Sequence, residues 1–504
     1  MIGNANLYAH YQKHFPTDLD THLLLDANGR SVTYAEADGV SARLANSLLQ
    51  LGAIRGDRVT VQVEKSVENV FLYLACLRAG LVYHPLNIAY KASELDYFLT
   101  DAEPTIVVCD SAVLPLIKSV VPAGGVKALP TLNADGSGTL MQHAADASAE
   151  ADAVQCKGED LAALLYSSGT TGQPKGIMLS HDNLRRNAET LVASWGFSAS
   201  DRLLHMLPLY HVHGLFVGLG CVLMSGASMA WHSRFSDKAA IAAMPDCTVM
   251  MGVPTYYTRL LANPEFGPEC CSNMRLFVSG SAPLLSETFV EFQTRTGHTI
   301  LERYGMTETG MNTSNPLHGE RRAGTVGPPL PGVNARVVDD AGQCVAEGET
   351  GNLQVHGPNV FTGYWRMPEK TTEDFTDDGF FNTGDKATID ADGYVSIVGR
   401  TKDMIISGGL NIYPKEIELV IDDMAGIAES AVIGIANADF GEAVLAVIVP
   451  DGNAPTTSEV TAHCRSMLAN FKVPKRVEVI DELPRNAMGK VQKNVLRERF
   501  GSAL

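Results

Sequence analysis

The 504-residue sequence has few of the features that mark zinc-binding, secreted or membrane-spanning proteins. Its nine cysteines form no C-x-x-C pair and no Cys/His spacing typical of zinc, which favours reduced thiols and a cytoplasmic location. The first residues contain no apolar signal-peptide core and no arginine-rich transit pattern. We therefore expect no export signal.

Long apolar runs and an excess of basic residues are also missing. The longest stretch without a charged residue, 203–233, contains Pro208, four glycines and four histidines, which a membrane helix rarely carries. Lys and Arg number 39 against 57 Asp and Glu, which gives a net charge of −18. Because nucleic acids and anionic membranes repel such a surface, we expect neither as a partner.

The remaining composition is that of an ordinary globular chain, with 45% hydrophobic and 19% charged residues. Short β-branched runs at 58–63, 105–110 and 163–167 alternate with helix-like segments, which predicts an α/β fold. A domain boundary is expected near residue 400. The turn signal DADGY and the short strand VSIVG precede it, and a helix-like segment at 414–424, two strand-like runs and a basic end follow it. We expect a large N-terminal α/β domain with several sheets over 1–400 and a small α+β domain over 401–504.

The most specific motif is YSSGTTGQPKG at 166–176. It follows an apolar strand, and its glycines, hydroxyls and Lys175 are typical of a loop whose N–H groups and side chains surround phosphate oxygens. It differs from a Walker A loop, because Lys175 follows Pro174 and no serine or threonine comes next. The segment therefore predicts a phosphate-binding loop other than a Walker A loop.

Four further segments pass from a short apolar strand to a break at proline or glycine and then to polar residues. They are HMLPLYHVHG, TVMMGVPTYYTR, RLFVSGSAPL and TILERYGMTETG. In open α/β sheets, ligands bind outside the carboxyl ends of the strands, so these breaks are expected to line one crevice. The side chains expected to converge there are His211, Arg259, Ser281, Tyr304, Thr307 and Glu308.

Five motifs in order resemble those of the adenylate-forming superfamily of acyl-CoA synthetases, adenylation domains and luciferases. They are YSSGTTGQPKG, YGMTET, GFFNTGD, GRTKDMIISGGLNIYPKEIE and PRNAMGK. Within the superfamily, LPLYHVHGL, GVPTYYTRLL and SGSAPLL resemble malonyl-CoA synthetases. The resemblance implies a ligase that uses ATP and Mg²⁺ to convert malonate, and secondarily methylmalonate, to an acyl-AMP. The acyl group then passes to CoA, and pyrophosphate and AMP are released.

The resemblance also implies the nucleotide contacts. Thr170 and Lys175 match residues on the pyrophosphate side, Thr307 the α-phosphate contact, and Glu308 the Mg²⁺ ligand. The residues that match adenine- and ribose-binding positions are Gly280, Ser281, Ala282, Glu302, Arg303, Tyr304, Asp385 and Arg400. A carboxylate accepts hydrogen bonds from both ribose hydroxyls, which suits the position of Asp385.

The C-terminal domain is implied to be mobile and to carry a catalytic lysine. Lys490 matches the residue that reaches the carboxylate and the α-phosphate during adenylation. Lys402 falls at the family's hinge, and Gly408 and Gly409 fall beside the pantetheine tunnel. A lysine acyltransferase would neutralise Lys490, and a deacylase would restore its charge.

Malonate carries a second carboxylate, and the burial of that charge is costly without a cation. Arg259 matches malonyl-CoA synthetases and is the predicted partner, with Ser281, His211 and Met306 completing a short pocket. Arg275 is the rival cation. Two alternatives stay open: a ligase for acetate or propionate, and a nucleotide-binding protein that forms no thioester.

Overall fold

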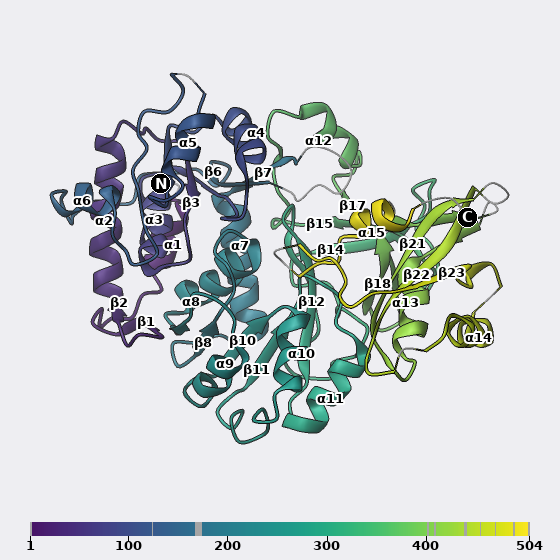
Figure 1. The fold of residues 1–504 in the computed structure, drawn as a ribbon. Helices are drawn as coiled ribbons and strands as arrows, with labels where there is room; N and C mark the ends of the chain where they lie inside the picture. Colours follow the sequence, from purple (N-terminus) through teal and green to yellow (C-terminus); the bar gives the residue numbers. More distant parts are fainter. Residues whose placement is uncertain are drawn as a thin grey trace.

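The computed structural model describes residues 3–122, 124–166, 174–400, 403–407, 410–437, 441–453, 455–468, 470–486 and 489–501. Within them the chain forms three sheets up to residue 400 and a fourth after it. Figure 1 shows the last hundred residues, in yellow-green, on one flank of the rest. The predicted fold class is confirmed. The boundary between residues 400 and 401 stays a prediction, since 401 and 402 lie outside the described residues.

The largest sheet has eight strands and is parallel except at its two edges. Its order is β13 (Gly310–Ser314), β12 (Ile300–Met306), β11 (Leu276–Ser279), β10 (Val249–Gly252), β8 (Arg202–His205), β9 (Ser228–Trp231), β1 (His22–Asp26) and β2 (Ser31–Thr33). The central strands are short apolar runs buried along their whole length, as expected for parallel strands covered on both faces.

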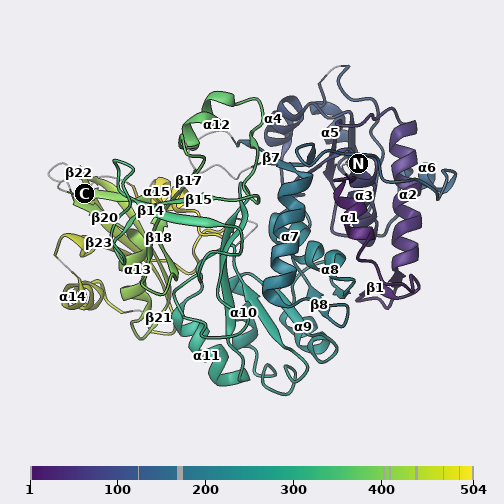
Figure 2. The same cartoon turned by 180° about the vertical axis from the view of Figure 1, so that it is seen from behind.

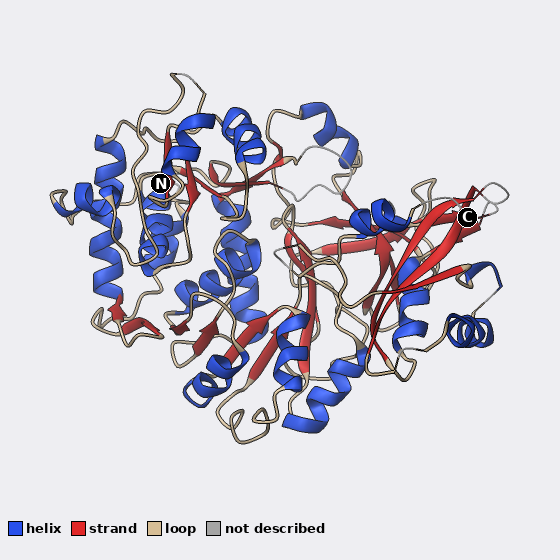
Figure 3. Ribbon diagram, in the orientation of Figure 1, coloured by secondary structure: helices blue, strands red, loops and turns tan. Residues whose placement is uncertain are grey.

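Helices flank this sheet and leave the carboxyl ends of its strands to loops. Figure 3 shows these helices, in blue, packed along the red strands. They are α8 (Leu219–Ser225), α9 (Asp237–Ala243), η2 (Met244–Asp246), α10 (Pro254–Ala262), α11 (Ser286–Thr296) and the π-helical turn η1 (His213–Gly218). Pro254 opens α10 directly after β10, which places the start of this helix at the carboxyl edge of the sheet.

The second sheet has six strands. Its order is β16 (Gly363–Tyr364), β7 (Gly176–Ser180), β6 (Leu161–Tyr166), β4 (Val82–Pro85), β3 (Arg58–Gln62) and β5 (Ile106–Cys109). The strands β3, β5 and β6 lie where the β-branched runs predict them. The helices of this half are α1 (Leu7–Gln12), α2 (Tyr34–Gln50), α3 (Val67–Arg78), α4 (Ala92–Ala102), α5 (Leu114–Val120) and α6 (Thr139–Ala145).

Helix α7 (His181–Trp195) joins the two large sheets. It begins at Ser180, whose hydroxyl accepts the Asn183 N–H while the Asn183 side chain accepts the Ser180 N–H. One face of the helix contacts β6 and β7, and another contacts β13. Its buried residues belong to the same core cluster as the apolar residues of both sheets.

The third sheet is antiparallel and is formed by strands between residues 334 and 400. Its order is β14 (Asn334–Val338), β15 (Gly351–His356), β17 (Phe381–Ile389) and β18 (Val395–Arg400), and α12 (Pro368–Asp374) lies beside it. The tight turn at 390–393 connects β17 to β18. Figure 2 shows from behind that this sheet lies between the eight-stranded sheet and the last hundred residues.

The C-terminal part has its own sheet and its own apolar core. The strands are β19 (Ile405–Ser407), β20 (Leu410–Ile412), β21 (Ile427–Asn437), β22 (Gly441–Pro450) and β23 (Arg476–Val479), and the helices are α13 (Pro414–Asp422), α14 (Thr457–Met467), η4 (Asn470–Lys472) and α15 (Lys493–Phe500). Alternate residues of β21 and β22 face α13 and α14 on one side and α15 on the other.

No helix among the described residues is long and apolar enough to span a membrane. The uncharged stretch 203–233 instead forms β8, η1, α8 and β9. Its apolar residues are buried in the core between the sheets.

Candidate active site

Loops from β8, β11 and β12 meet at the carboxyl edge of the eight-stranded sheet. The Ser281 Oγ, just beyond β11, lies 3.3 Å from the His213 Nδ1, beyond β8. Gly280 lies against the Arg303 side chain of β12, and a Cβ atom at Gly280 would clash with the guanidinium carbon. Only glycine allows this approach. Ser281 itself has a left-handed φ of +72°, an uncommon backbone state for a residue with a side chain.

Arg303 is the cation at the centre of this edge. Its side chain is 3% exposed, and its Nε and Nη2 have no hydrogen-bond partner among the described residues. Burial lowers the pKa of Arg303 to about 10, so the guanidinium remains charged at neutral pH. Buried donors of this kind are rarely left unpaired in a folded protein, and a buried charge normally has a counter-charge. The arrangement therefore suits an anionic ligand.

The two histidines of the β8 loop are neutral groups that face this cation. Burial, followed by the charges of Lys490 and Arg303, lowers the pKa of His211 to about 3. Burial and the Arg303 charge lower the pKa of His213 in the same way. The His213 N–H donates to the His211 Nδ1 at 3.3 Å. Because both rings stay neutral, they suit hydrogen bonding to a ligand better than proton abstraction at neutral pH.

Tyr304 and Asp385, which are predicted to bind adenine and ribose, lie on the other side of β12 from Arg303. The Tyr304 hydroxyl donates to the Asp385 Oδ2 at 2.5 Å, and the backbone of Asp385 lies opposite that of Arg400 in the pairing of β17 with β18. Side chains alternate along a strand, so Tyr304 and Arg303 point to opposite faces. Arg303, which matches an adenine-binding segment in sequence, thus directs its guanidinium toward the acyl side of the crevice.

Glu302 supports the loop after β11. Its Oε1 accepts the Leu284 N–H at 3.0 Å, whereas its Oε2 has no partner among the described residues. Burial raises the pKa of Glu302 to about 7. Gly280 and Ala282 belong to the same loop, so the predicted adenine segments are neighbours in space.

Lys175 and Glu308, which are predicted to act at the phosphates, lie near one tyrosine. The Lys175 Nζ lies 4.3 Å above the Tyr364 ring and 3.8 Å from the Asp374 Oδ2. The carboxylate of Glu308 is buried and contributes to a raised pKa of Tyr364, after the larger effect of burial. Thr307 precedes Glu308 in the turn between β12 and β13. Thr170 lies outside the described residues.

Two residues of α4 that the sequence analysis missed contact the described ends of the predicted phosphate-binding motif. The Tyr97 hydroxyl donates to the Pro174 carbonyl at 2.6 Å, and the Tyr166 hydroxyl donates to the Asp101 carboxylate at 2.5 Å. The only sequence signal is the spacing of Tyr97 and Asp101, which places both on one face of α4.

Glu308 fits a magnesium ion bound mainly through nucleotide phosphates. No group of three or more His, Cys, Asp or Glu side chains gathers among the described residues. Mg²⁺ in nucleotide sites is commonly held by one or two carboxylates together with substrate phosphates and water. A single buried carboxylate beside the phosphate-binding motif suits that coordination.

Lys490 lies at the end of a tight hairpin. The Asn486 N–H donates to the Lys490 carbonyl at 2.9 Å, and the Asn486 Oδ1 accepts the Lys490 N–H at 3.0 Å. Arg485 donates to the Gly489 carbonyl at 2.6 Å and also pairs with Glu429 of β21. These contacts fix the backbone of the hairpin to the C-terminal sheet.

The same hairpin touches the N-terminal part of the chain. A Cβ atom at Gly489 would lie 3.5 Å from the Thr255 Oγ1, in the first turn of α10. The Lys490 charge also contributes to the lowered pKa of His211. The structure thus brings Lys490 to the crevice that contains Ser281 and Arg303.

The two arginines considered for the second carboxylate lie elsewhere. Arg259 is exposed on α10 and lines a shallow groove with Asp237 and Glu265. It makes no ion pair with the described part of the chain, and it follows Thr255 by one helical turn on the same face. The structure therefore places Arg259 at the rim of the site, not inside the crevice as predicted.

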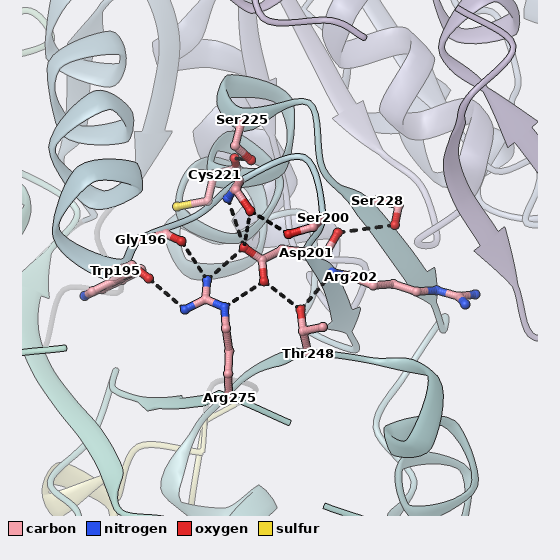
Figure 4. A network of polar contacts seen from close by, with 11 residues as sticks. Trp195, Gly196, Ser200, Asp201, Arg202, Cys221, Ser225, Ser228, Thr248 and Arg275 are labelled. Atoms are coloured by element: carbon pink, nitrogen blue, oxygen red, sulfur yellow. Dashed lines mark hydrogen bonds and ion pairs between the residues drawn. The ribbon is translucent and has the colours of Figure 1, made fainter. Parts of the chain in front are cut away.

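Arg275 is not a candidate ligand, which corrects its interpretation as the rival cation. It directly precedes β11 and so lies at the amino end of that strand, opposite the crevice. Its Nε and Nη2 donate to the Asp201 carboxylate at 2.7 and 2.8 Å, and further donors reach the carbonyls of Trp195 and Gly196 (Figure 4). These contacts occupy the guanidinium.

Three other predicted residues cannot be compared with the structure. Lys402, Gly408 and Gly409 lie outside the described residues. Met306 ends β12, three residues beyond Arg303.

A sequence model of the AMP-binding enzyme family matches residues 12–365, and a model of the AMP-binding enzyme C-terminal domain matches residues 416–490. The chain therefore belongs to the AMP-binding, adenylate-forming enzymes. It is 52% identical to MatB from Rhodopseudomonas palustris over 99% of both chains. The TM-score is 0.97 against the ATP-bound structure of that protein and 0.86 against its apo structure. The structure is thus more similar to the ATP-bound structure of that protein than to its apo structure.

More distant relatives differ in the acid named for them. The chain is 35% identical to a malonate–CoA ligase of Homo sapiens, over 95% of this chain and 90% of that protein. It is also 35% identical to a feruloyl-CoA synthase of Amycolatopsis, over 94% and 95%. Equal identity to both means that the acid has to be argued from the site.

Proposed function

We propose that this protein is an ATP-dependent malonate–CoA ligase, with methylmalonate as a secondary substrate. The observation that carries the choice of malonate is the buried guanidinium of Arg303, whose Nε and Nη2 have no hydrogen-bond partner in the described part of the chain, beside Ser281 and His213. A monocarboxylate has one anionic group, and that group reacts with ATP. A dicarboxylate has a second group that remains ionised and would pair with Arg303.

The reaction has two steps, each a substitution. A malonate oxygen attacks the α-phosphorus of ATP, the bond to the β-phosphate breaks, and pyrophosphate leaves. The CoA thiolate then attacks the acyl carbon, the carbon–oxygen bond to AMP breaks, and malonyl-CoA forms. Two anions meet in the first step, so cations and oriented donors are the main requirement.

The chain's residues divide this work. Lys490 offsets charge on the reacting carboxylate and the α-phosphate, Thr307 donates to that phosphate, and Lys175 and Thr170 act on the pyrophosphate. Bound Mg²⁺, held through Glu308, would neutralise phosphate charge. Asp385 and Arg400 hold the ribose, while Tyr304 positions Asp385.

The second carboxylate has an inner and an outer cation in this proposal. Arg303 pairs with it inside the crevice, and Ser281, His211 and Met306 limit the length of the acid. Arg259 is exposed at the rim, where its long side chain can turn toward the same carboxylate.

The second step and its control are also part of the proposal. The C-terminal domain turns at Lys402 and presents Gly408 and Gly409 to the pantetheine arm of CoA. Acylation of Lys490 by a lysine acyltransferase would stop the first step, and a deacylase would restore it. The proposal includes a cytoplasmic location.

The test is to measure AMP and thioester formation with ATP, CoA and a panel of acids: malonate, methylmalonate, succinate, acetate and propionate. We expect malonyl-CoA to form fastest and methylmalonyl-CoA next. Preference for acetate or propionate would replace malonate with the monocarboxylate alternative. AMP-binding without any thioester would favour a nucleotide-binding protein.

A further inference from the structure

Lys65 is a buried lysine, 9% exposed, that the reaction described above does not use. It lies between β3 of the six-stranded sheet and α3, and its Nζ contacts three acceptors of the eight-stranded sheet. These are the His205 Nδ1 at 2.8 Å, the His205 carbonyl at 2.9 Å and the His232 carbonyl at 2.6 Å. The Trp231 ring lies 4.2 Å from the same atom. An ammonium group has three N–H donors, so all of them are used within the protein.

His205 connects Lys65 to the turn η1. Its Nε2 lies 2.9 Å from the Gly214 carbonyl, which can only accept, so the Nε2 carries the proton and the Nδ1 is free to accept from Lys65. The same ring packs on Gly218, where a Cβ atom would lie 3.3 Å from it. His205 therefore contacts both ends of η1.

The turn η1 is a π-helix, a rare form that often occurs at functional sites. It begins at His213, whose Nδ1 lies 3.3 Å from the Ser281 Oγ. Gly214 has no space for a side chain, because a Cβ atom there would overlap the Pro208 carbonyl. The position of His213 thus depends on how firmly His205 holds the turn.

We propose that Lys65 and His205 are positioning residues for the acyl side of the active site. A continuous chain of contacts runs from Lys65 through His205 and Gly214 to His213 and Ser281. Neither Lys65 nor His205 contacts the acid, and their effect is to fix the wall of its pocket. This inference rests on the proposed acid site but does not require that the acid be malonate.

Lys65 also lines a cavity of about 340 Å³ with Tyr210 and Tyr256, which raises the question of whether it binds a ligand directly. Its donors are already paired with the histidine ring and two carbonyls. A direct ligand contact would leave one of these buried acceptors without a partner, which is costly. A positioning role fits the geometry better.

The test compares two isosteric changes at His205. In His205→Gln the side-chain amide reaches the place of the Nε2 and keeps the bond to Gly214, whereas in His205→Asn the amide reaches only toward Lys65. Lys65→Met keeps the length of the side chain and removes its donors. Because small displacements of a pocket wall cost about tenfold to a hundredfold, we expect His205→Asn and Lys65→Met each to lower kcat/KM for the acid by that factor.

The KM for ATP should change less than the KM for the acid, because Ser281 is the only residue of the relay that also matches a nucleotide-binding position. His205→Gln loses the ring contact to Lys65 but keeps the bond to Gly214, so it should lower kcat/KM for the acid less than His205→Asn does. The combination Lys65→Met with His205→Asn should be no worse than the more damaging single change, because both break one chain. Arg78→Met is the matched control: it removes a buried cation from α3 that pairs with Asp38, outside this chain of contacts.

Equal behaviour of the Gln and Asn variants, or equal shifts of KM for acid and ATP, would overturn the positioning role. So would Arg78→Met lowering kcat/KM for the acid as much as Lys65→Met. The variants are compared with the wild type on whichever acid it uses fastest. A wild type that prefers another acid would therefore overturn the proposed function without deciding the positioning role.

Discussion

Two arginines at opposite edges of the eight-stranded sheet differ in whether their guanidinium donors have partners. Arg275, at the amino end of β11, gives its donors to the Asp201 carboxylate and to backbone carbonyls. Arg303, in β12 just beyond the residues that pair with β11, has two donors without partners in the described part of the chain. The first guanidinium stabilises the fold, and the second is available to a ligand.

The polar atoms near the two arginines also differ in whether they have hydrogen-bond partners. The buried atoms without partners among the described residues include the Ser279 Oγ, the His213 Nε2 and the Glu302 Oε2, all at the carboxyl edge. At the amino edge, Thr248 donates to Asp201 and completes its pairing. Proteins commonly keep such unsatisfied groups and unusual backbone states at functional sites, at the expense of stability.

The largest effect is expected for Lys490→Ala. Loss of one preorganised cation should slow adenylation about 10²- to 10³-fold, while supplied malonyl-AMP is still converted to malonyl-CoA within a few-fold of the wild-type rate. Pyrophosphate release and thioester formation are measured separately. Lys472→Ala is the control, because Lys472 pairs with Glu416 away from the hairpin. Equal loss of both steps would contradict the assigned role.

At the amino edge, Arg275→Met should lower the free energy of unfolding by about 3 kcal/mol, because it leaves the buried Asp201 carboxylate without its counter-charge. The KM for malonate of the folded variant should stay unchanged. Chemical denaturation and steady-state kinetics measure the two quantities. Arg202→Met, at the same edge, should have a much smaller effect on stability. A raised KM with unchanged stability would give Arg275 the role assigned here to Arg303.

At the rim, Arg259→Ala should lower the ratio of kcat/KM for malonate to that for propionate about tenfold, or about 1.4 kcal/mol. Propionate lacks the carboxylate that Arg259 would reach, so its own turnover should change little. Lys238→Ala removes a neighbouring charge from the same groove and serves as the control. If kcat/KM falls by the same factor for both acids, Arg259 has a structural role and does not bind the second carboxylate.

The smallest effect is expected for Glu302→Gln, and it depends on pH. The folded-state pKa of about 7 lies above the ordinary value, so the folded protein holds a proton that the unfolded chain releases above about pH 4.5. The contribution of Glu302 to the free energy of unfolding of the wild type therefore decreases as pH rises from about 4.5 to 7.

The Gln variant should be more stable than the wild type by about 1 to 3 kcal/mol at pH 8 and about equal to it at pH 4.5. Urea denaturation at both values checks this. Glu347→Gln, at an exposed position, should show no such pH dependence. A difference that does not change with pH would contradict the buried-carboxyl explanation.

Local sequence was enough to predict the fold class and the motifs that meet at the carboxyl edge. Apolar runs predicted β3, β5 and β6, and the breaks after β8, β10, β11 and β12 are visible as proline or glycine followed by polar residues. Each of these signals lies within a few neighbouring residues.

The sequence alone could not predict which face of a strand a side chain points to or which distant residues pair. Whether Arg303 or Tyr304 faces the acid depends on which face of β12 is turned to it, and one residue of register reverses that choice. Asp201 pairs with Arg275 across 74 residues, and Lys65 meets His205 across 140. Such contacts arise only when separate strands are placed side by side.

The most direct test of the central claim is the acid preference of Arg303→Met. If the buried guanidinium pairs with the second carboxylate, kcat/KM for malonate should fall by about 2 to 5 kcal/mol in transition-state free energy. Propionate, which lacks that group, should lose much less, so the malonate preference of the wild type should disappear. Arg275→Met should keep that preference. Equal losses of malonate and propionate turnover in Arg303→Met would contradict the proposed carboxylate site.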